Sequence, residues 1–571
     1  MKKTLTIISA LFLTVCSLVG AERHIPVIRV EFSDLQFSGD ESRTLEITEQ
    51  AGVYFSQQHF DGIEFHFDLC ATVTLENPYA YYGANATDRR DAMLYKAVSR
   101  ACTLADQSMD FRKYDNDNDG FVDTVMLIMA GESEADGTGE DYIWPVQDFL
   151  KSYDSVILLD GKRINSFCVV TESDGLGMFC HEYGHALGLS DYYDTDGESS
   201  GGLSKGMWSC TALMDGGYRN AEGCMPPYLN AVDLLTLGTG ICEEMTYGDY
   251  RLEPIRVNGR YLRLNGSSSD ECYLFECRDN EGWDREIGGS GMLVYHVVRS
   301  DADAGFSDYY RKNLTAAQRW KCNQVNCRPW MECASLVEAM PHAQDVKDVF
   351  FPQEGRTRIS EGTDPSISFW DHHSPAMALT DMRIATDGSI CFTVIEPMKF
   401  TGSSIFQDAA IFSWTVHESI KDITHCTAVW CKSGERYPDE ETPTGDGSLV
   451  LDGLEPACDY DIRITAHAAN GDRFFLVSHF KTKSSKSGVM PYIYLTGTGR
   501  NHDGTFPRSA KIPLKVFNAG DAAEIVWYYN GQRVQPGPGG FFSPATNGTL
   551  KAEVYWQDGT VDVIIKEVTL R

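Results

Sequence analysis

The string HEYGHALGLSD, which begins at His181, constrains this chain more than any other feature of its sequence. His181 and His185 are spaced so that, on a helix, both imidazoles project from one face about one turn apart. Two imidazoles at this spacing can bind one metal ion, and Glu182 can then reach a water molecule on that ion. Catalytic zinc usually takes three protein ligands, and Gly188 tolerates the positive φ of a sharp turn that returns Asp191 to the metal. The pattern therefore predicts a zinc site held by His181, His185 and Asp191, with Glu182 as general base.

Two alternatives bear on this predicted site. A helix can contain two histidines and a glutamate by chance, but the glycine and the aspartate at fixed offsets argue against that interpretation. Asp194 follows Asp191 closely in the sequence and is the alternative third ligand.

A methionine in a tight turn beneath the zinc is typical of metzincin peptidases. Met214 occurs in the string LMDGG, where Gly216 and Gly217 can supply the turn, whereas Met207 is followed by Trp and lacks such residues. We therefore expect Met214 to form this turn; the alternative is an ordinary core methionine. Tyr218 follows directly, and it either hydrogen-bonds the oxyanion of the transition state or packs at the surface.

The first residues have the layout of a secretory signal peptide at positions 1–21. Two lysines precede an apolar stretch, and small residues before Glu22 offer a cleavage site. A lipoprotein cut at Cys16 is less favoured, because Val15 is larger than the residue that usually precedes a lipidated cysteine. No other apolar run is long enough to predict a transmembrane segment. We therefore expect a secreted, extracellular or cell-surface protein.

The composition argues against a nucleic-acid partner, because the formal net charge is −33 and such proteins are normally basic. A length of 571 residues predicts three or four domains at roughly 150 residues each. The 17 cysteines become an even number once Cys16 leaves with the signal, which fits disulfide bonds in an oxidising compartment. The alternative is that many of them are free buried thiols.

Aspartates alternate around a glycine in the string YDNDNDGFVD, and hard oxygen ligands at such positions suit Ca²⁺. The position where an EF-hand would place its last glutamate is Met126, which excludes an EF-hand. The alternative is a solvated turn. The candidate calcium ligands are Asp115, Asp117, Asp119 and Asp123.

Alternating strands and helices predict an α/β (α+β) catalytic domain at residues 22–247. Asp88 is the candidate cap of one helix, and Ser173 or Asp174 the candidate cap of the helix that carries the two histidines. The predicted strands cover 24–32, 124–130 and 165–171, and the other predicted helices cover 45–57 and 87–109.

The later part of the chain predicts all-β modules, including β-sandwiches. An all-β module is predicted at 248–398, with an insertion at 300–345. In the next module Trp414 and Tyr460 occupy the places of a core tryptophan and of a tyrosine corner. That module, at 399–483, is therefore predicted to be a fibronectin type III-like sandwich, and 489–571 an Ig-like β domain after a polar linker.

The sequence resembles the immune inhibitor A family of secreted bacterial metallopeptidases over about residues 24–396. The resemblance is carried by PVIRVEFSD, YDNDNDGFVD, IWPVQD, HEYGHALGLSDYYD, MWSCTALMDGG, CYLFECRDNEGWD and GSGMLVYHV. It implies a metzincin-like domain that cleaves internal peptide bonds, with His181, His185 and Asp191 on zinc. It also implies Glu182 as the base and Met214 as the turn methionine.

The expected function is therefore a zinc metalloendopeptidase acting on proteins or peptides. One rival is a binding protein, in which the C-terminal sandwiches bind glycans or host proteins and the zinc domain is a relic. The intact Glu182 argues against a relic, because loss of the base is the simplest inactivating change. A second rival is a zinc hydrolase that acts on bonds other than peptide bonds.

Overall fold

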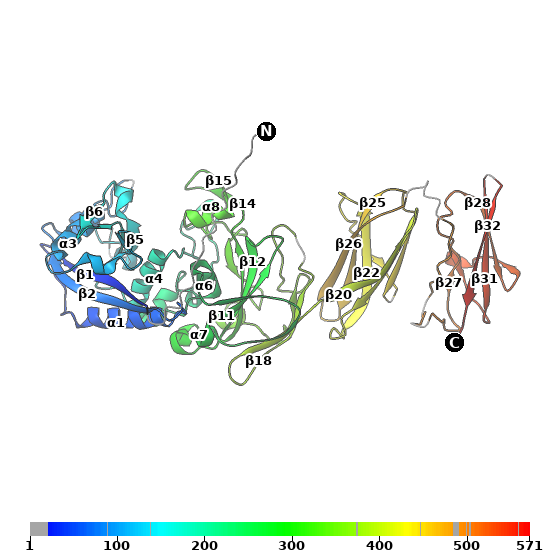
Figure 1. Ribbon diagram of the computed structural model, residues 1–571, viewed down its shortest axis with the longest axis horizontal. Helices are drawn as coiled ribbons and strands as arrows, with labels where there is room; N and C mark the ends of the chain where they lie inside the picture. The colour runs from blue at the N-terminus through cyan, green and yellow to red at the C-terminus, as the bar shows by residue number, and fades with distance from the viewer. Residues whose placement is uncertain are drawn as a thin grey trace. The chain divides into compact units, whose positions relative to one another are not determined.

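The computed structural model describes residues 21–87, 89–137, 139–372, 375–445, 447–483, 490–497, 500–501, 504–557 and 559–571 (Figure 1). All but the last residue of the predicted signal peptide lie outside the described residues, and so does Asp88. The chain divides into two compact units. The first comprises the residues up to Arg358 together with Ser368–Pro375 and Thr380–Thr393, and the second comprises Ile359–Ile367, Ala376–Leu379 and Val394–Arg571.

The first unit begins with a five-stranded sheet whose strand order is β2-β1-β4-β8-β5. Its first four strands run parallel, and β5 pairs antiparallel with β8 at one edge. The central strands are apolar runs that are buried on both faces, as parallel strands covered by helices must be. The strands are β1 (Glu22–Glu31), β2 (Glu64–Thr74), β4 (Val125–Met129), β5 (Val146–Phe149) and β8 (Ser166–Thr171).

Helices cover both faces of this sheet (Figure 1). Helices α1 (Ser42–Ser56) and α4 (Leu176–Leu187) share one hydrophobic core with Ile25 and Val27 of β1. Helix α3 (Leu94–Ala105) packs on the opposite face, in a second core. This helix is shorter than the predicted 87–109, because residues 90–93 form a turn.

The predicted cap of α4 was wrong. Its N-cap is Gly175, and no side chain caps the helix. Asp174 instead turns its Oδ2 back to the amide and hydroxyl of Thr171, at 2.7 and 2.9 Å. Those bonds close the turn between β8 and α4, so the carboxylate is not available to the first turn of the helix.

The first unit also contains a small second sheet and several short helices. The sheet has the order β3-β7-β6, with β3 (Phe121–Val122), β6 (Ile157–Leu159) and β7 (Lys162–Ile164). The short helices are α2 (Tyr79–Gly83), α5 (Asn220–Gly223), α6 (Ala231–Leu237) and α7 (Ile255–Asn258).

The rest of the first unit is mainly β-structure. Its largest sheet has the order β16-β13-β12-β11-β9, and β14 and β15 form a separate hairpin next in sequence to helix α8 (Ala316–Lys321). Three further strands, β10, β19 and β18, lie in another sheet. The bounds are β9 (Ile241–Glu244), β10 (Gly248–Leu252), β11 (Arg260–Asn265), β12 (Glu271–Arg278), β13 (Gly291–Val298), β14 (Asp303–Ser307), β15 (Lys312–Thr315), β16 (Ala334–Leu336), β18 (Ala378–Ile384) and β19 (Ile390–Ile395).

One hydrophobic core runs through both parts of the first unit. It contains residues of α1 and α4, and it continues through Leu274 and Tyr295 of the large β-sheet to Phe350. The residues predicted as a catalytic domain and as a separate β module are therefore packed together as one folded body.

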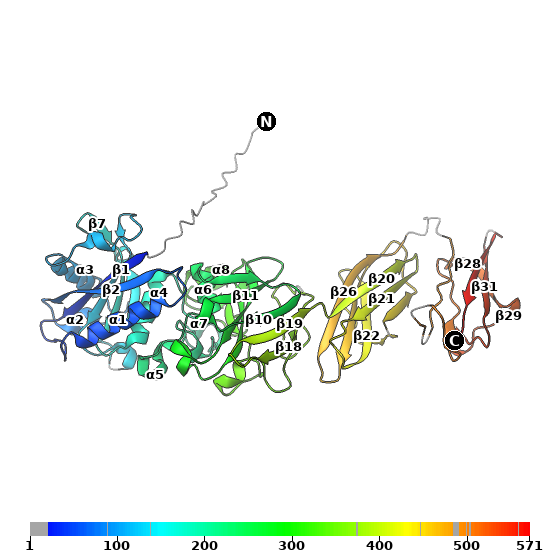
Figure 2. The same ribbon diagram turned by 60° about the horizontal axis from the view of Figure 1, so that its bottom comes forward.

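The second unit contains a two-sheet sandwich, with strand orders β20-β21-β24 and β23-β22-β25-β26 (Figure 2). Trp414 is buried in its core, and the Tyr460 hydroxyl accepts a hydrogen bond from the Glu455 amide at 2.9 Å. In addition, β17 (Ile359–Ser360) pairs with the first residues of β18. The sandwich strands are β20 (Met398–Ile405), β21 (Ala409–Val416), β22 (Ile423–Lys432), β23 (Thr442–Pro443), β24 (Ser448–Asp452), β25 (Asp459–Ala468) and β26 (Arg473–Lys481).

The last part of the second unit has its own core around Trp527 and Leu550. Its sheets have the orders β29-β28-β31-β32 and β27-β30, and Asn530 and Gly531 form the turn that joins β28 to β29. The strands are β27 (Ile512–Pro513), β28 (Ala522–Tyr529), β29 (Gln532–Val534), β30 (Phe541–Phe542), β31 (Gly548–Trp556) and β32 (Val561–Val568).

The structure forms none of the expected disulfide bonds among the described residues. All 16 cysteines after Cys16 are free, and half of them are buried. Cys102, Cys168 and Cys180, for example, lie in hydrophobic cores, where a thiol behaves as a small apolar side chain. Within the same part of the chain, no helix combines the length and the apolar character that crossing a bilayer requires.

Candidate metal centre

Helix α4 carries His181, Glu182 and His185, and its end is set by Gly188. Gly188 adopts a left-handed φ of +107° and donates to the last carbonyls of the helix. The chain can therefore reverse at once, as predicted, and it returns Asp191 to the face that carries the two histidines. His181, Glu182 and Asp191 are each no more than 4% exposed.

The side chains of His181, His185 and Asp191 converge. Nε2 of each imidazole lies 3.2 Å from Oδ1 of Asp191, and the two rings are almost perpendicular. Each Nδ1 lies against a backbone carbonyl, at 3.0 Å for His181 and Leu213 and at 2.9 Å for His185 and Leu189. With Nδ1 as the donor in these bonds, each Nε2 is left with a lone pair directed at the point of convergence.

These residues fit a metal ion. Oδ1 of Asp191 is buried, and apart from the two imidazoles no donor in the described part of the chain forms a hydrogen bond to it. Two imidazole nitrogens and one carboxylate oxygen are donors that zinc accepts, and three such ligands leave a position for water or substrate. The alternative ligand Asp194 lies elsewhere: its carboxylate accepts bonds from the Asp196 and Ser204 amides.

The protonation of this group follows from its burial and charges. Burial lowers the pKa of His185, but the Asp191 carboxylate more than offsets this and raises that pKa to about 9. Burial raises the pKa of Asp191, but the two histidines outweigh burial and hold this pKa below its usual range. Without metal, a proton is therefore held between His185 and Asp191, and a metal ion must displace it.

Glu182 has the environment of a base. Its carboxylate is buried beside His181, and burial raises its pKa, with the two histidines opposing that rise only in part. A carboxylate with a raised pKa can accept a proton closer to neutral pH than a solvated one can.

Met214 lies directly against the helix that carries the histidines. A side chain on Gly184 would meet the Met214 sulfur at 2.8 Å, so the absence of a Cβ at position 184 lets the two segments approach. The residue before it, Leu213, provides the carbonyl for His181, and the carbonyl of Met214 accepts the Tyr192 amide at 2.8 Å. The rival Met207 is also buried, but it lies beside Asn230.

Two tyrosines stand near His181. The ring centroid of Tyr218 is 4.9 Å from that of His181, and the ring of Tyr193 is 6.4 Å away. Burial raises the pKa of Tyr193, so its hydroxyl stays protonated and able to donate. A hollow of about 270 Å³ opens beside Tyr218, and Met178 and Arg219 are among the residues that line it.

Asn323 is a site residue that the sequence did not reveal. Its Nδ2 donates to Oδ2 of Asp191 at 2.7 Å, and its Oδ1 accepts the Asp191 amide at 2.8 Å. This reciprocal pair fixes both the backbone and the carboxylate of the predicted third ligand. Asn323 follows α8 in the segment predicted as an insertion, and no motif or spacing relates it to the histidines.

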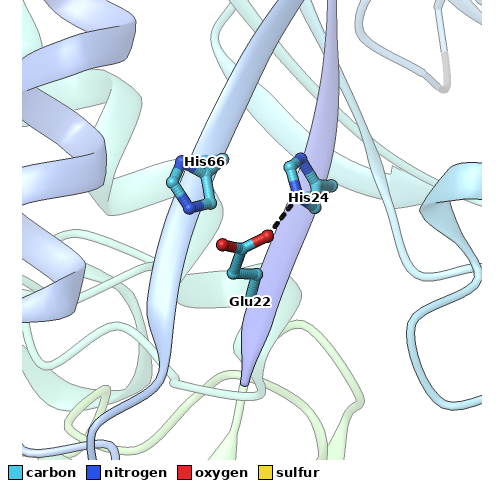
Figure 3. Close-up of side chains that lie close together, drawn as sticks. All are labelled: Glu22, His24 and His66. Atoms are coloured by element: carbon cyan, nitrogen blue, oxygen red, sulfur yellow. Dashed lines mark hydrogen bonds and ion pairs between the residues drawn. The ribbon is translucent and has the colours of Figure 1, made fainter. Parts of the chain in front are cut away.

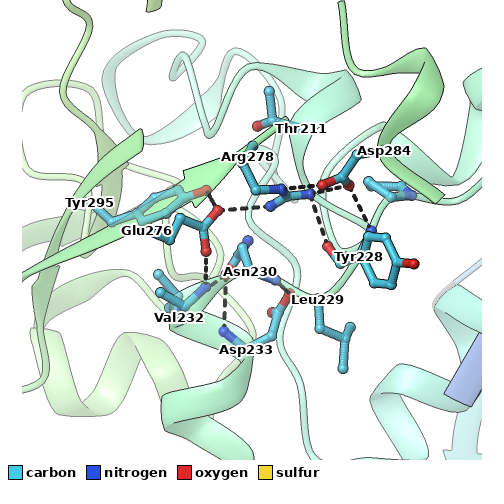
Figure 4. Close-up of polar contacts among 12 residues, drawn as sticks. Thr211, Tyr228, Leu229, Asn230, Val232, Asp233, Glu276, Arg278, Asp284 and Tyr295 are labelled. Atoms are coloured by element: carbon cyan, nitrogen blue, oxygen red, sulfur yellow. Dashed lines mark hydrogen bonds and ion pairs between the residues drawn. The ribbon is translucent and has the colours of Figure 1, made fainter. Parts of the chain in front are cut away.

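A buried polar network supports the same region from the β-structure (Figure 4). Arg278 of β12 is fully buried and pairs with Glu276 at 2.7 Å and with Asp284 at 2.6 Å. Glu276 also accepts the amide at the start of α6 at 2.6 Å. On α6, Asp233 accepts a bond from the hydroxyl of Tyr192, which follows Asp191, at 2.7 Å.

The predicted calcium loop is held together by its own polar groups. Asp115, Asp117 and Asp123 lie close enough to share a cation, and Asp119 is not in that group. Lys162 forms an ion pair with Asp115, so a protein cation already faces this carboxylate. The Asp119 carboxylate instead accepts the Phe121 amide at 2.7 Å, as in an Asx turn. Calcium binding by this loop stays a prediction.

Known proteins resemble the part of the chain that holds this site. Residues 29–226 match the family described as "Immune inhibitor A peptidase M6, catalytic domain". The chain is 26% identical to "Immune inhibitor A" from Bacillus thuringiensis subsp. alesti over 196 residues, which are 29% of this chain and 28% of that protein. It is 27% identical to "Pre-pro-metalloprotease PrtV" from Vibrio cholerae serotype O1 over 168 residues, which are 23% of this chain and 18% of that protein.

The matched segments cover less than a third of these relatives. A solved structure described as a computer-based redesign of a β-sandwich protein aligns with 16% of this chain and 92% of its own chain, at 24% identity. Its TM-score of 0.13 is too low to assign a fold. The sequence matches therefore show that residues 29–226 are similar to the catalytic domain of the immune inhibitor A peptidase family.

Proposed function

We propose that this chain is a secreted zinc-dependent endopeptidase that hydrolyses internal peptide bonds. The observation that carries the proposal is the convergence of two imidazole nitrogens on one buried carboxylate oxygen, in a domain of a peptidase family. His181, His185 and Asp191 would hold the zinc ion. Met214 supports the helix beneath them, and Asn323 fixes the orientation of Asp191.

Each side chain has a separate part in the proposed reaction. When bound, zinc supplies a Lewis acid that polarises a carbonyl group and lowers the pKa of water to roughly 7. Glu182 takes the proton of the attacking water and returns it to the leaving amine, which its raised pKa favours. The two histidines are held by backbone carbonyls and need not exchange protons during the reaction.

The surroundings of His181 suggest where a peptide would bind. The rings of Tyr218 and Tyr193 both lie near His181, so either hydroxyl is a candidate donor to the negative charge that develops on a reacting carbonyl group. The hollow beside Tyr218 has room for a substrate side chain. Its lining combines Met178 with charged groups such as Asp136 and Arg219, so an apolar side chain with a polar end would suit it.

The proposal also includes secretion of the chain and a supporting role for the second unit. The signal-like start of the sequence supports secretion, and the net charge of −33 keeps the chain soluble outside the cell. We find no second catalytic set among the described residues of the two C-terminal β regions, which would act on substrate choice or attachment. Binding of glycans or host proteins by these regions stays a prediction.

The test is digestion of a casein-like protein, with the products identified by mass spectrometry. Internal cuts that a chelator abolishes and zinc restores are the expected result. The Glu182→Gln variant should retain zinc and lose at least about 100-fold in turnover, the usual scale for a general base. Glu198→Gln, at an exposed position, is the matched control and should behave as wild type. Unchanged turnover by zinc-loaded Glu182→Gln would remove this residue from the reaction, and release of terminal residues alone would exclude an endopeptidase.

A further inference from the structure

A second group of metal-binding side chains lies at the start of the central sheet, on strands β1 and β2. His24 of β1 and His66 of β2 are in register in the parallel pair, and so are Glu22 and Glu64. The two rings stack with centroids 4.9 Å apart and planes inclined by 18°. Figure 3 shows the Glu22 carboxylate directed towards both rings.

The donor atoms of this group lie close together. One ligand atom from each of Glu22, His24 and His66 falls within 4.8 Å of the others. Nε2 of His24 is 3.4 Å from a carboxylate oxygen of Glu22, and Nε2 of His66 is 3.9 Å from one of Glu64. Small rotations of these half-exposed side chains would bring three ligands onto one ion.

Two further residues, Asp68 and Asn116, orient His24 for metal binding. Nδ1 of His24 pairs with Asp68 at 2.9 Å, which leaves Nε2 with the lone pair and matches the way carboxylates orient metal-bound imidazoles. Asn116 bonds both the amide and the carbonyl of His24, at 3.0 and 3.1 Å, and so fixes its backbone. The ring nitrogen Nε2 of His66 is buried and has no hydrogen-bond partner among the described residues.

The charge of the group also favours a cation. Glu22, Glu64 and Asp68 each have a histidine as ion-pair partner, and a neutral imidazole leaves these carboxylates uncompensated. A divalent ion would balance two of the three charges. Imidazole nitrogen together with carboxylate oxygen is a donor set for zinc, nickel and copper rather than for calcium or magnesium.

We propose that Glu22, His24 and His66 form a second metal site, which takes a divalent transition-metal ion of the zinc, nickel and copper class. The ion joins the first strand of the fold to β2, the edge strand of the sheet. His66 lies far from the other two ligands in the sequence, so the site exists only in the folded chain. Bound metal therefore stabilises the folded state by linkage.

The site is tested in a full chain that carries His181→Ala and His185→Ala, which removes the imidazoles of the first centre. Zinc is titrated against a chromophoric chelator, and Cu²⁺ is followed by electron paramagnetic resonance. The expected result is one bound equivalent, nitrogen coupling from two imidazoles, and a higher Tm with zinc present. Adding His66→Ala should weaken binding at least about tenfold, which is 1.4 kcal/mol, and remove the Tm shift.

A matched control comes from the stacked pair His425 and His467, whose centroids are 4.4 Å apart. Nε2 of His467 already contacts Thr427 and Glu441, so we do not expect this stacked pair to bind a metal ion. His425→Ala should therefore leave metal binding unchanged. Glu22→Gln, at an exposed position, keeps the test decisive should His66→Ala fail to fold, and it should also weaken binding. Absence of metal in the starting variant, or binding that neither His66→Ala nor Glu22→Gln alters, would overturn the proposal.

Discussion

The two units of this chain build their interiors in different ways. In the first unit a core extends from Ile25 to Phe350 through both of its parts, beside the separate core under α3, and charged groups such as Arg278, Asp233 and Glu276 are buried in the same unit. In the second unit the two β regions have separate main cores, joined by a small cluster around Phe406 and Phe517. Its buried polar residues, among those described, are Ser360, Thr363, Thr427, Thr465, Thr482 and Asn518.

This difference indicates how strongly the stability of each unit depends on individual buried residues. Apolar alternation is sufficient to specify a sandwich core, because each inward-facing residue needs only apolar neighbours. The first unit depends in addition on particular pairs of buried polar residues that are remote in the sequence. Single substitutions should therefore damage the first unit far more than the second, and the predictions below test that contrast.

The largest effect should come from Arg278→Met. The change leaves Glu276 and Asp284 as buried carboxylates without their cation, and breaking such a pair costs about 3–5 kcal/mol. The calorimetric transition of the first unit should shift strongly downwards, while that of the second unit stays in place. Arg533→Met is the matched control, because its pair with Glu524 is exposed and contributes about 0–1 kcal/mol.

A triple variant sharpens this prediction. Combining Arg278→Met with Glu276→Gln and Asp284→Asn removes all three charges, so most of the lost stability should return. If Arg278→Met alone leaves the first transition unchanged, the buried network does not hold the first unit together.

The next effect concerns Asn323, which positions the predicted ligand Asp191. Asn323→Gly removes the two bonds to Asp191 and suits the backbone, whose φ at this position is +52°. Zinc affinity should fall about 10–100-fold, as for other groups that orient metal ligands. Chelator competition measures this directly. Asp194→Ala should change the affinity much less, and the reverse order would make Asp194 the third ligand.

Asn323 also shows the limit of prediction from the sequence. His181, Glu182, His185, Gly188 and Asp191 form one local pattern, because helix geometry and a single turn suffice to bring them together. The strand predicted at 124–130 coincides with β4, and that at 165–171 with β8, to within one residue at each end, for the same local reason. Contacts such as Asn323 with Asp191 arise only from the packing of remote segments, and no spacing in the sequence encodes them.

The failed predictions have related causes. Ser173 or Asp174 is the expected cap of α4, but neither side chain caps it, and the Asp174 carboxylate bonds to Thr171 in the preceding turn, a choice that only the folded turn decides. An even number of cysteines predicted disulfides, yet burial of individual thiols in separate places accounts for many of them. The domain boundary expected near residue 248 stays a prediction: the structure changes there from mixed to β-structure, and one hydrophobic core contains residues from both sides of it.

A smaller effect should appear in the pH dependence of stability. Burial raises the pKa of Asp91 in the first unit to about 7, so the folded state holds a proton there that the unfolded state loses near pH 4. The contribution of Asp91 to the free energy of unfolding is fully present below about pH 4 and is lost as pH rises through about 7. Asp91→Asn should flatten this fall by up to about 1.4 kcal/mol per pH unit, the value for one proton.

The second unit provides the internal comparison for this experiment. Its exposed carboxylate Asp459 has a pKa lowered by the hydrogen bond from Lys481, so it acts in the opposite direction, with stability lost as pH falls below about 4. Unfolding of both units is followed by calorimetry between pH 4 and 8. An unchanged slope for the first transition in Asp91→Asn would contradict the raised pKa, and the second transition should be the same in both proteins.

The smallest effect is expected from removing most of the second unit. A chain that ends at residue 398 keeps the whole core between Ile25 and Phe350, together with every residue of the candidate metal centre. It uncovers Ala378, Ile395 and Met398, which belong to the sandwich core. We expect kcat/KM for a short peptide to change less than about tenfold, or 1.4 kcal/mol. A chain that ends at residue 299 lacks Asn323 and part of the first core, and it should not bind zinc. A greater than tenfold loss in the soluble, zinc-loaded 398-residue chain would mean that the sandwiches help to build the site, and the contrast between the two units would not hold.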